Sequence, residues 1–180
     1  AHLLTALPPG EAAQLIQQMP EIEAADLVEE LPPETAAAIV EELPSDQKAH
    51  LVGDLPEERA EAILSELDPV VADEVRSLSS YDRNVAGALM VTEYVAFKAE
   101  ATVDEVIDDF RANADAYRGY QVQYAYVTGT DDRLVGVLQL RDLLLADKQQ
   151  AIEKLMVRQP LTVAHDTGLD DLRDLILAQR

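Results

Sequence analysis

A leucine–proline pair recurs at every twelfth position in the first part of this chain, and this spacing constrains the fold more than any other feature. The pair, in which Met once replaces Leu, occurs at Leu7-Pro8, Met19-Pro20, Leu31-Pro32, Leu43-Pro44 and Leu55-Pro56. Leu67 continues the series, with Asp68 inserted before Pro69. Because a fixed period is the signature of a repeat architecture, we expect one structural unit for each period.

Each repeat unit predicts one short helix. Proline is tolerated in the first turn of a helix and breaks a helix interior, so each Pro marks a helix start. Alanine and aliphatic residues recur five, eight and nine positions after the Leu or Met of each unit, except for Lys48 and Arg76. A helix of roughly eight or nine residues is too short to be stable alone. We therefore expect neighbouring units to pair as helical hairpins, which stack into a short α-solenoid over residues 1–78.

The predicted solenoid carries most of the negative charge. The chain of 180 residues has a formal net charge of −21, with 35 acidic and 14 basic side chains. Residues 1–80 contain 18 Asp and Glu against 3 Lys and Arg, whereas residues 81–180 contain 17 against 11. Such a surface repels phosphate backbones and anionic lipids, which argues against nucleic-acid binding and membrane-surface binding. The same surface favours cations or a basic partner.

The composition argues against an enzyme. There is no Cys, which excludes disulfides, zinc–thiolate sites and thiol nucleophiles. His2, His50 and His165 lie far apart in sequence, and no Ser/His/Asp arrangement is present. No apolar stretch approaches the roughly 18 uninterrupted residues of a membrane span, so we expect this piece of chain to be soluble and not to insert into a membrane.

From about residue 87 the pattern changes to the order strand–helix–strand–strand–helix. Thr102 and Glu105 have the spacing of a capping box at the start of the helix. Gly129-Thr130-Asp131-Asp132 has turn chemistry between two strands, which predicts a hairpin. The expected strands and the closing helix are Tyr94–Phe97, Val122–Thr128, Leu134–Leu138 and Arg141–Ala146.

Part of this βαββα unit returns later in the chain at a constant offset. Leu89-Met90-Val91 matches Leu155-Met156-Val157, and Asp104-Glu105-Val106 matches Asp170-Asp171-Leu172. The second copy stops before its own hairpin. We therefore predict an α+β chain with four parts: acidic helical repeats at 1–78, a linker at 79–88, a complete domain at 89–148 and an incomplete second domain at 149–180.

The βαββα unit resembles a CBS domain, through Leu89-Met90, the hairpin and the closing segment Gly136–Leu143. With the acidic repeat and the segment Ala86–Val95, the chain is similar to the cytosolic part of MgtE-type magnesium channels. This resemblance implies a regulatory region in which Mg²⁺ ions bridge the acidic domain and the CBS surfaces and favour a closed pore. It also implies a location on the cytoplasmic side of the cell membrane, a covalently linked transmembrane pore domain and a homodimer formed through CBS domains.

The resemblance also implies candidate metal ligands. Asp46 occupies the position of an Asp that the N domain of the family contributes, and His50 stands where the family can carry another Asp. Gln14 stands where the family can carry Glu. We take Asp46, His50 and Glu42 as candidate Mg²⁺ ligands. Ion chemistry agrees with carboxylates in this role, because Mg²⁺ keeps most of its waters and uses one or two carboxylates per site.

ATP is a second candidate ligand, since CBS pairs often bind adenine nucleotides. The usual Gly-x-x-Ser/Thr-x-x-Asp motif reads Gly136, Gln139 and Asp142 here, without the hydroxyl. By resemblance, Asp142 would hold a ribose, Arg141 a phosphate and Tyr124 a base. Two other functions stay open: an acidic interaction module for basic partners, and an adenine-nucleotide sensor unrelated to magnesium transport.

Overall fold

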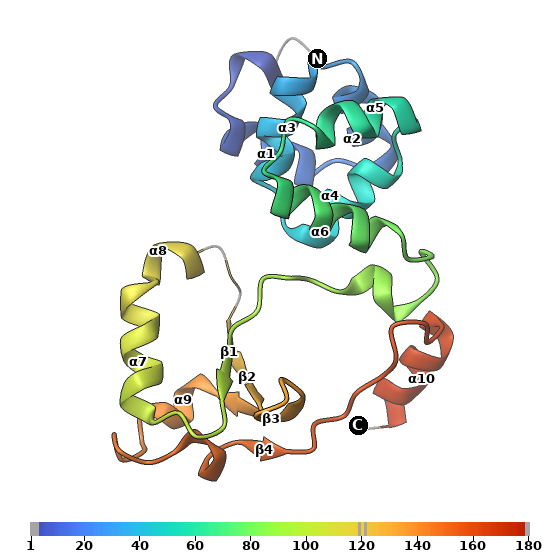
Figure 1. The fold of residues 1–180 in the computed structure, drawn as a ribbon. Helices are drawn as coiled ribbons and strands as arrows, with labels where there is room; N and C mark the ends of the chain where they lie inside the picture. The colour runs from blue at the N-terminus through green and yellow to red at the C-terminus, as the bar shows by residue number, and fades with distance from the viewer. Residues whose placement is uncertain (1–3, 119, 121, 179–180) are drawn as a thin grey trace. The chain divides into compact units, whose positions relative to one another are not determined.

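The computed structural model describes residues 4–118, 120 and 122–178. The chain forms two compact units (Figure 1). The first unit runs up to Thr92 and includes the chain again from Val163 onwards, and the second unit runs from Glu93 to Thr162. Each unit has a buried hydrophobic core of its own.

In the described part of the repeat, six short helices follow a single 3-10 turn. Five of them follow an N-cap proline, namely Pro8, Pro20, Pro32, Pro44 and Pro56, which confirms that the repeat prolines mark helix starts. The sixth is capped by Asp68, whose carboxylate accepts a hydrogen bond of 2.9 Å from the Val70 amide. The elements are η1 (Leu4–Ala6), α1 (Pro9–Gln17), α2 (Glu21–Glu29), α3 (Pro33–Glu41), α4 (Ser45–Gly53), α5 (Glu57–Leu64) and α6 (Pro69–Ser79).

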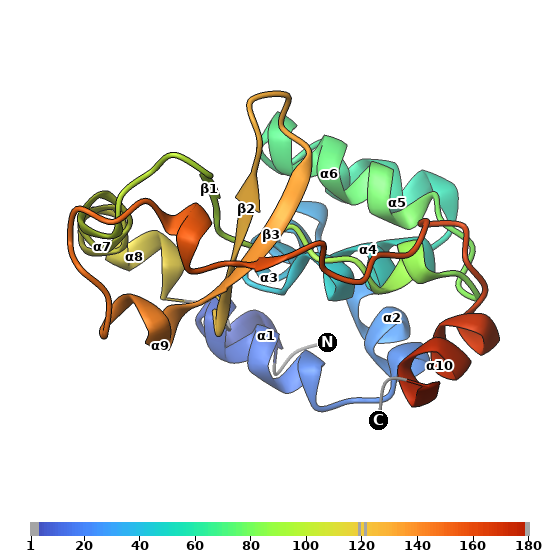
Figure 2. The same cartoon turned by 90° about the horizontal axis from the view of Figure 1, so that it is seen from below.

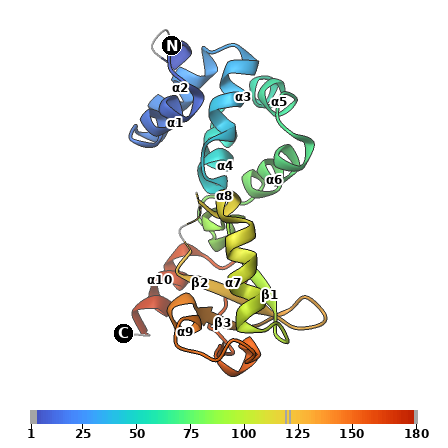
Figure 3. The ribbon, with the colours of Figure 1, turned by 90° about the vertical axis from the view of Figure 1, so that its left-hand side faces the viewer.

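Helices two units apart stack on one another. The main packing pairs are α1 with α3, α3 with α5, α2 with α4, and α4 with α6, and Figure 3 shows α3 between α1 and α5. Adjacent helices, which we expected to form hairpins, pack less extensively. The reason lies in the connections, where each N-cap proline holds an extended ψ between 141° and 151°. An extended residue at this point carries the chain away from the preceding helix.

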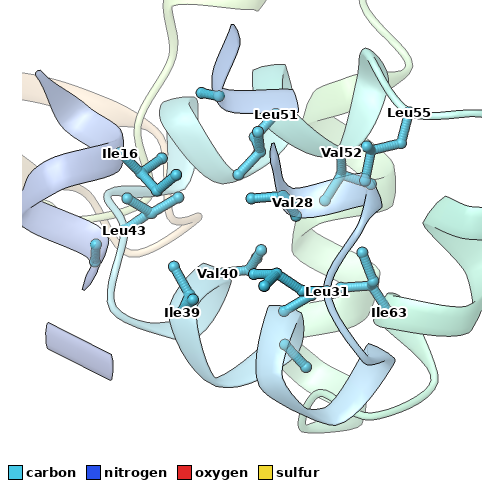
Figure 4. Close-up of a cluster of buried hydrophobic side chains, with 14 of the residues drawn as sticks. Ile16, Val28, Leu31, Ile39, Val40, Leu43, Leu51, Val52, Leu55 and Ile63 are labelled. Atoms are coloured by element: carbon cyan, nitrogen blue, oxygen red, sulfur yellow. The ribbon is translucent and has the colours of Figure 1, made fainter. Parts of the chain in front are cut away.

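The in-phase aliphatic positions form the core of the repeat. Val28, Val40 and Val52 occupy one repeat position, Ile39 and Ile63 occupy another, and all five are at most 3% exposed (Figure 4). These side chains come from the successive helices α2 to α5, and the same cluster continues into α1 and α6. The short helices are therefore stable because their apolar faces are shared.

The described residues of the second unit form a four-stranded sheet with helices on one face. The strand order is β1-β2-β3-β4, in which β1 is parallel to β2 and the other neighbours are antiparallel. This confirms the predicted βαββα order, although the helix expected at 141–146 ends at Leu143. The elements are β1 (Ala96–Lys98), α7 (Val103–Ala112), α8 (Ala114–Tyr117), β2 (Tyr124–Thr128), β3 (Leu134–Gln139), α9 (Leu140–Leu143), η3 (Ile152–Lys154) and β4 (Val157–Arg158).

Burial alternates along β2, which lies beside β3 in the sheet (Figure 2). Ala125 and Val127 are fully buried and belong to one cluster with Val103 and Val106 of α7. Tyr124 and Tyr126 point to the other face and are 49% and 40% exposed. The period of two residues in a strand thus leaves a tyrosine-rich face open to solvent.

The constant offset between the two copies recurs in the structure. The second copy begins with η3, the counterpart of η2 (Ala86–Leu89), and α10 (Leu169–Ala178) spans the positions of α7 shifted by the same offset. Backbone bonds follow this shift: the Val103 amide donates to the Gln150 carbonyl (3.0 Å), and the Leu169 amide donates to the Asn84 carbonyl (2.8 Å). Each stretch before one module therefore pairs with the helix start of the other.

Candidate cation and nucleotide sites

Asp46 lies in the first turn of α4 and is half-buried. Its Oδ1 accepts a hydrogen bond of 2.8 Å from the Gln47 amide. The unpaired amides of a helix start favour acidic side chains, so the first turn of α4 is a suitable place for Asp46. A carboxylate is also a ligand type that Mg²⁺ uses.

Glu42, the C-cap residue of α3, lies four residues before Asp46 on the other side of the α3–α4 connection. It is exposed, and its Oε2 lies 3.6 Å from the point where a Cβ on Gly10 would stand. Glu42 therefore extends from α3 over the first turn of α1. This position leaves the carboxylate accessible to a hydrated ion.

His50 lies one helical turn after Asp46, in the last turn of α4. Its Nε2 is 3.1 Å from the Ala88 carbonyl oxygen, and its Nδ1 is 3.9 Å from Glu21 Oε1. Because a carbonyl only accepts hydrogen bonds, the contact with Ala88 assigns a proton to Nε2, and in a neutral ring Nδ1 would then be the unprotonated nitrogen. Histidine ligands of metal ions commonly show this arrangement, in which a carbonyl holds one ring nitrogen and the other can bind the ion.

Sequence reasoning missed an ion-pair group beside His50. Arg83 pairs with Asp54 and with Glu21, at 3.7 Å in the latter pair, and donates to the His50 carbonyl at 3.4 Å. The hydrogen bond to Asp54 raises the pKa of Arg83, helped by the charges of Asp54 and Glu21. One feature of the sequence could have pointed to this ion pair. Arg83 is the first basic residue after Arg76, and it follows a strongly acidic stretch of sequence.

A small cavity lies between α1, α2 and α4. Its volume is about 190 Å³, below the roughly 300 Å³ at which pockets for drug-sized ligands begin. Gln17, Glu21, Gln47 and His50 form the polar part of its wall, and the remaining lining is apolar. The cavity therefore places polar groups near the Asp46 turn and is too small for a nucleotide.

The candidate metal ligands do not form a closed coordination shell. Among the residues that the structure describes, no group of three or more Asp, Glu or His side chains is arranged to hold a metal ion. Asp46 and His50 share one helix, and Glu42 ends the preceding one. His165 is exposed, with its ring 5.3 Å from that of Tyr81, and His2 lies outside the described residues. A water-rich Mg²⁺ site that uses one or two carboxylates remains compatible with this set.

The three predicted nucleotide contacts meet at one end of the β2–β3 hairpin. Tyr124, the first residue of β2, pairs in register with Gln139, the last residue of β3. Arg141 and Asp142 follow in α9, with Arg141 Nε 3.5 Å from Asp142 Oδ1. The Leu140 amide donates to the Gln123 carbonyl at 3.3 Å, which holds the hairpin end together.

A second aromatic group extends this end of the hairpin. Tyr126 lies two residues after Tyr124 on the same exposed face, and its ring meets that of Tyr94 edge to face at 5.7 Å. Exposed aromatic rings on β2, together with an acid and an arginine that follow β3, are residue types that suit a ligand with a base, a ribose and phosphates. Sequence reasoning identified Tyr124 for this role and did not assign one to Tyr94 or Tyr126.

An acidic helical repeat joined to a CBS module defines the class of this chain as a CBS-domain protein with an N-terminal helical repeat. The family model for the MgtE intracellular N domain matches residues 1–84, and the CBS domain model matches residues 85–148. The crystal structure of the cytosolic domain of the Mg²⁺ channel MgtE in complex with ATP superposes with a TM-score of 0.87 and 32% identity, covering 98% of this chain and 71% of that one. The chain belongs to the MgtE family.

Other relatives agree with this assignment. The magnesium transporter MgtE of Thermus thermophilus is 39% identical over 111 residues, which are 61% of this chain and 24% of the relative. MgtE of Enterococcus faecalis is 30% identical over 105 residues, 58% of this chain and 23% of the relative. The soluble part of a magnesium transporter matches with 25% identity and a TM-score of 0.75, covering 99% of this chain and 79% of that structure. The chain thus matches about a quarter of the length of these transporters.

Over the described part of the chain, the helices are too short or too polar for any of them to cross a bilayer.

Proposed function

We propose that this chain is the Mg²⁺-sensing regulatory region of a magnesium channel. Divalent ions bridge the acidic helical repeat and the CBS surfaces, and this bridging favours the closed pore. The observation that carries the proposal is the charge of the repeat, 18 acidic against 3 basic residues within residues 1–80, on a fold shared with the Mg²⁺ channel MgtE. Like charges on one surface repel, and divalent ions relieve this repulsion.

Within this proposal, Asp46 is the principal ligand and Glu42 and His50 support it. Asp46 is a half-buried carboxylate in the first turn of α4, where it accepts a hydrogen bond from the Gln47 amide. Glu42 offers an exposed carboxylate, and His50 offers Nδ1. Ions held by so few ligands bind weakly and exchange readily, so their occupancy follows the concentration of free Mg²⁺.

The same proposal covers the parts of the protein that this chain does not contain. A transmembrane pore domain is linked covalently, the region lies on the cytoplasmic side of the membrane, and CBS domains form a homodimer. The role is regulatory and not catalytic, in line with relatives that are named as transporters. We retain the limits 1–78, 79–88, 89–148 and 149–180 as proposed parts of the chain, supported by the family matches to 1–84 and 85–148.

ATP is the second ligand that a specific observation favours. Tyr124, Arg141 and Asp142 meet at the hairpin end, and the related cytosolic domain was solved in complex with ATP. Tyr124 would stack on the base, Asp142 would accept from the ribose hydroxyls and Arg141 would contact phosphate. Gln139 provides an amide where the usual motif has a hydroxyl, so the ribose edge of this site differs in chemistry.

The cation proposal is tested by thermal unfolding during a Mg²⁺ titration at constant ionic strength. The melting temperature of the wild type should rise over millimolar Mg²⁺, because a ligand that binds only the folded state stabilises it. Asp46→Asn should need several-fold more Mg²⁺ for the same rise. Asp26→Asn removes the same charge from an exposed position on α2 and should behave like the wild type. An equal rise with NaCl at matched ionic strength would leave only screening and would refute the proposal.

The nucleotide proposal is tested by calorimetric titration with ATP. Tyr124→Ala and Asp142→Asn should each weaken binding by about tenfold, because stacking and a charged hydrogen bond are each worth about 1–3 kcal/mol. Asp131→Asn is the matched control, since Asp131 is an exposed acid in the turn at the opposite end of the hairpin. Absence of binding to the wild type, or equal loss in the control, would contradict the assignment.

A further inference from the structure

Residues 83–92 lie along α4 in the antiparallel direction, and we call this segment the linker strap. At its start, Arg83 pairs with Asp54 at the end of α4. In its middle, the Ala88 carbonyl accepts from His50. At its end, the Thr92 amide donates to Ser45 Oγ at 2.9 Å, at the start of α4. The partners descend from 54 to 45 as the strap ascends from 83 to 92, so the contacts follow the whole length of the helix.

The strap is packed as well as hydrogen-bonded. Ala86, Gly87 and Ala88 of η2 are buried, and η2 packs against both α4 and α6. Ser45 is 3% exposed and is the one polar residue in the buried class among the described residues. A buried hydroxyl needs a partner, and Ser45 Oγ accepts the Thr92 amide.

The other edge of the strap pairs with residues 165–169, which lead into α10. The Ala86 amide donates to the Thr167 carbonyl at 2.8 Å, and the Gly87 amide donates to the His165 carbonyl at 2.7 Å. The Leu169 amide completes the pairing with the Asn84 carbonyl. These contacts join backbone to backbone, whereas the polar contacts just described between the strap and α4 each use a side chain of Ser45, His50 or Arg83.

We propose that the linker strap is a latch that needs no cation: Ser45, His50 and Arg83 are positioning residues that hold the strap, and with it the segment that leads into α10, on α4. The joint with α4 is the one that opens first, because its polar contacts depend on three side chains, whereas backbone hydrogen bonds hold the other edge. The proposal rests on these contacts and does not depend on a bound cation. It is linked to the proposed function because α4 also carries Asp46.

The test is amide hydrogen exchange on the full chain without divalent ions. In Ser45→Ala, His50→Ala and Arg83→Ala, the amides of 88–92 should exchange about tenfold faster, the effect of losing one buried hydrogen bond. The amides of Ala86, Gly87 and Leu169 should keep their protection, as should those in the interior of α4. His50→Gln retains a donor for the Ala88 carbonyl and should restore most of the protection.

Arg76→Ala is the matched control. Arg76 pairs with Glu61 and Asp73 on α5 and α6, and the substitution should leave the strap unchanged. Unchanged exchange rates at 88–92 in all three strap variants would overturn the proposal. An equal rise in the exchange rates throughout α4 would also overturn it, because strap and helix would then open as one cooperative unit. If His50→Ala lowers global stability, Ser45→Ala and Arg83→Ala decide the matter. No arm contains Mg²⁺, so failure of the cation proposal leaves this result intact.

Discussion

Gly87 and Gly53 lie in the same compact unit but differ in the space that surrounds them. A Cβ added to Gly87 would lie 2.5 Å from Tyr81 Cδ1 and 2.7 Å from Tyr81 Cγ, well inside van der Waals contact. A Cβ added to Gly53, the last residue of α4, would meet Ser79 Cβ at 3.8 Å, an ordinary contact. The same substitution therefore has opposite consequences at the two sites.

Gly87→Ala should lower the free energy of unfolding by about 1–3 kcal/mol, because the ring of Tyr81 or the backbone of η2 must move. Gly53→Ala should raise it by up to about 1 kcal/mol, because alanine loses less backbone entropy in a helix. Urea unfolding of both variants measures the two effects. Equal midpoints for both variants would show that the close approach of Tyr81 does not constrain position 87.

The capping box at α7 gives a pH dependence. Glu105 Oε2 accepts from the Thr102 amide (2.7 Å) and from its hydroxyl (2.9 Å), and these bonds lower the pKa of Glu105 below its ordinary value of 4.5, the backbone bond contributing most. A carboxyl with a lowered folded-state pKa contributes stability above its unfolded value and loses it as the pH falls through the folded value.

The difference in stability between the wild type and Glu105→Gln should therefore be constant near neutral pH and shrink below about pH 4.5. Urea unfolding of both proteins between pH 3 and pH 7 provides the comparison. Glu100→Gln, an exposed acid before the helix, should show no such convergence. A difference that stays constant down to pH 3 would mean that the charge of Glu105 does not support the cap.

At the scale of helices and strands, the sequence predicts where the helices of the repeat begin. A repeated proline fixes where each helix begins, and the apolar phase shows which face is buried. The positions of the apolar residues do not show which other helix packs against that face. For this reason we expected hairpins of adjacent helices, whereas in the structure helices two units apart stack. Backbone pairing between modules was also beyond prediction, since Asn84 and Gln150 have no side-chain pattern that marks their carbonyls as acceptors.

Ile39 and Leu15 test the repeat at the element scale, because they occupy the same repeat position in α3 and α1. Ile39 is 1% exposed in the middle of the stack, and Leu15 is 38% exposed at its end. Ile39→Ala should cost about 2–5 kcal/mol through lost burial and a cavity, and Leu15→Ala should cost less than about 1.5 kcal/mol. Denaturant unfolding of both variants gives the comparison, and similar losses would contradict a repeat that is packed mainly at its centre.

At the scale of the whole molecule, the sequence predicted the uneven distribution of charge and the family. For the candidate sites it predicted which residues to consider but not how they are arranged. Tyr124, Arg141 and Asp142 lie at one end of the hairpin, because Tyr124 begins β2 and the other two follow the end of β3. Asp46, His50 and Glu42 do not form a closed cluster within the described residues, and His50 is engaged with Ala88, far later in the chain. Such a long-range partner depends on the path of the chain after α6, which periodicity does not encode.

The central claim is that divalent ions, and not ionic strength, draw the acidic repeat and the CBS module together. The most direct measurement is the radius of gyration in solution scattering, recorded in Mg²⁺ and in NaCl of equal ionic strength. We predict a smaller radius in millimolar Mg²⁺ than in NaCl, and a diminished response in Asp46→Asn. The same radius in both salts would contradict the claim, because screening alone would then account for the effect of charge.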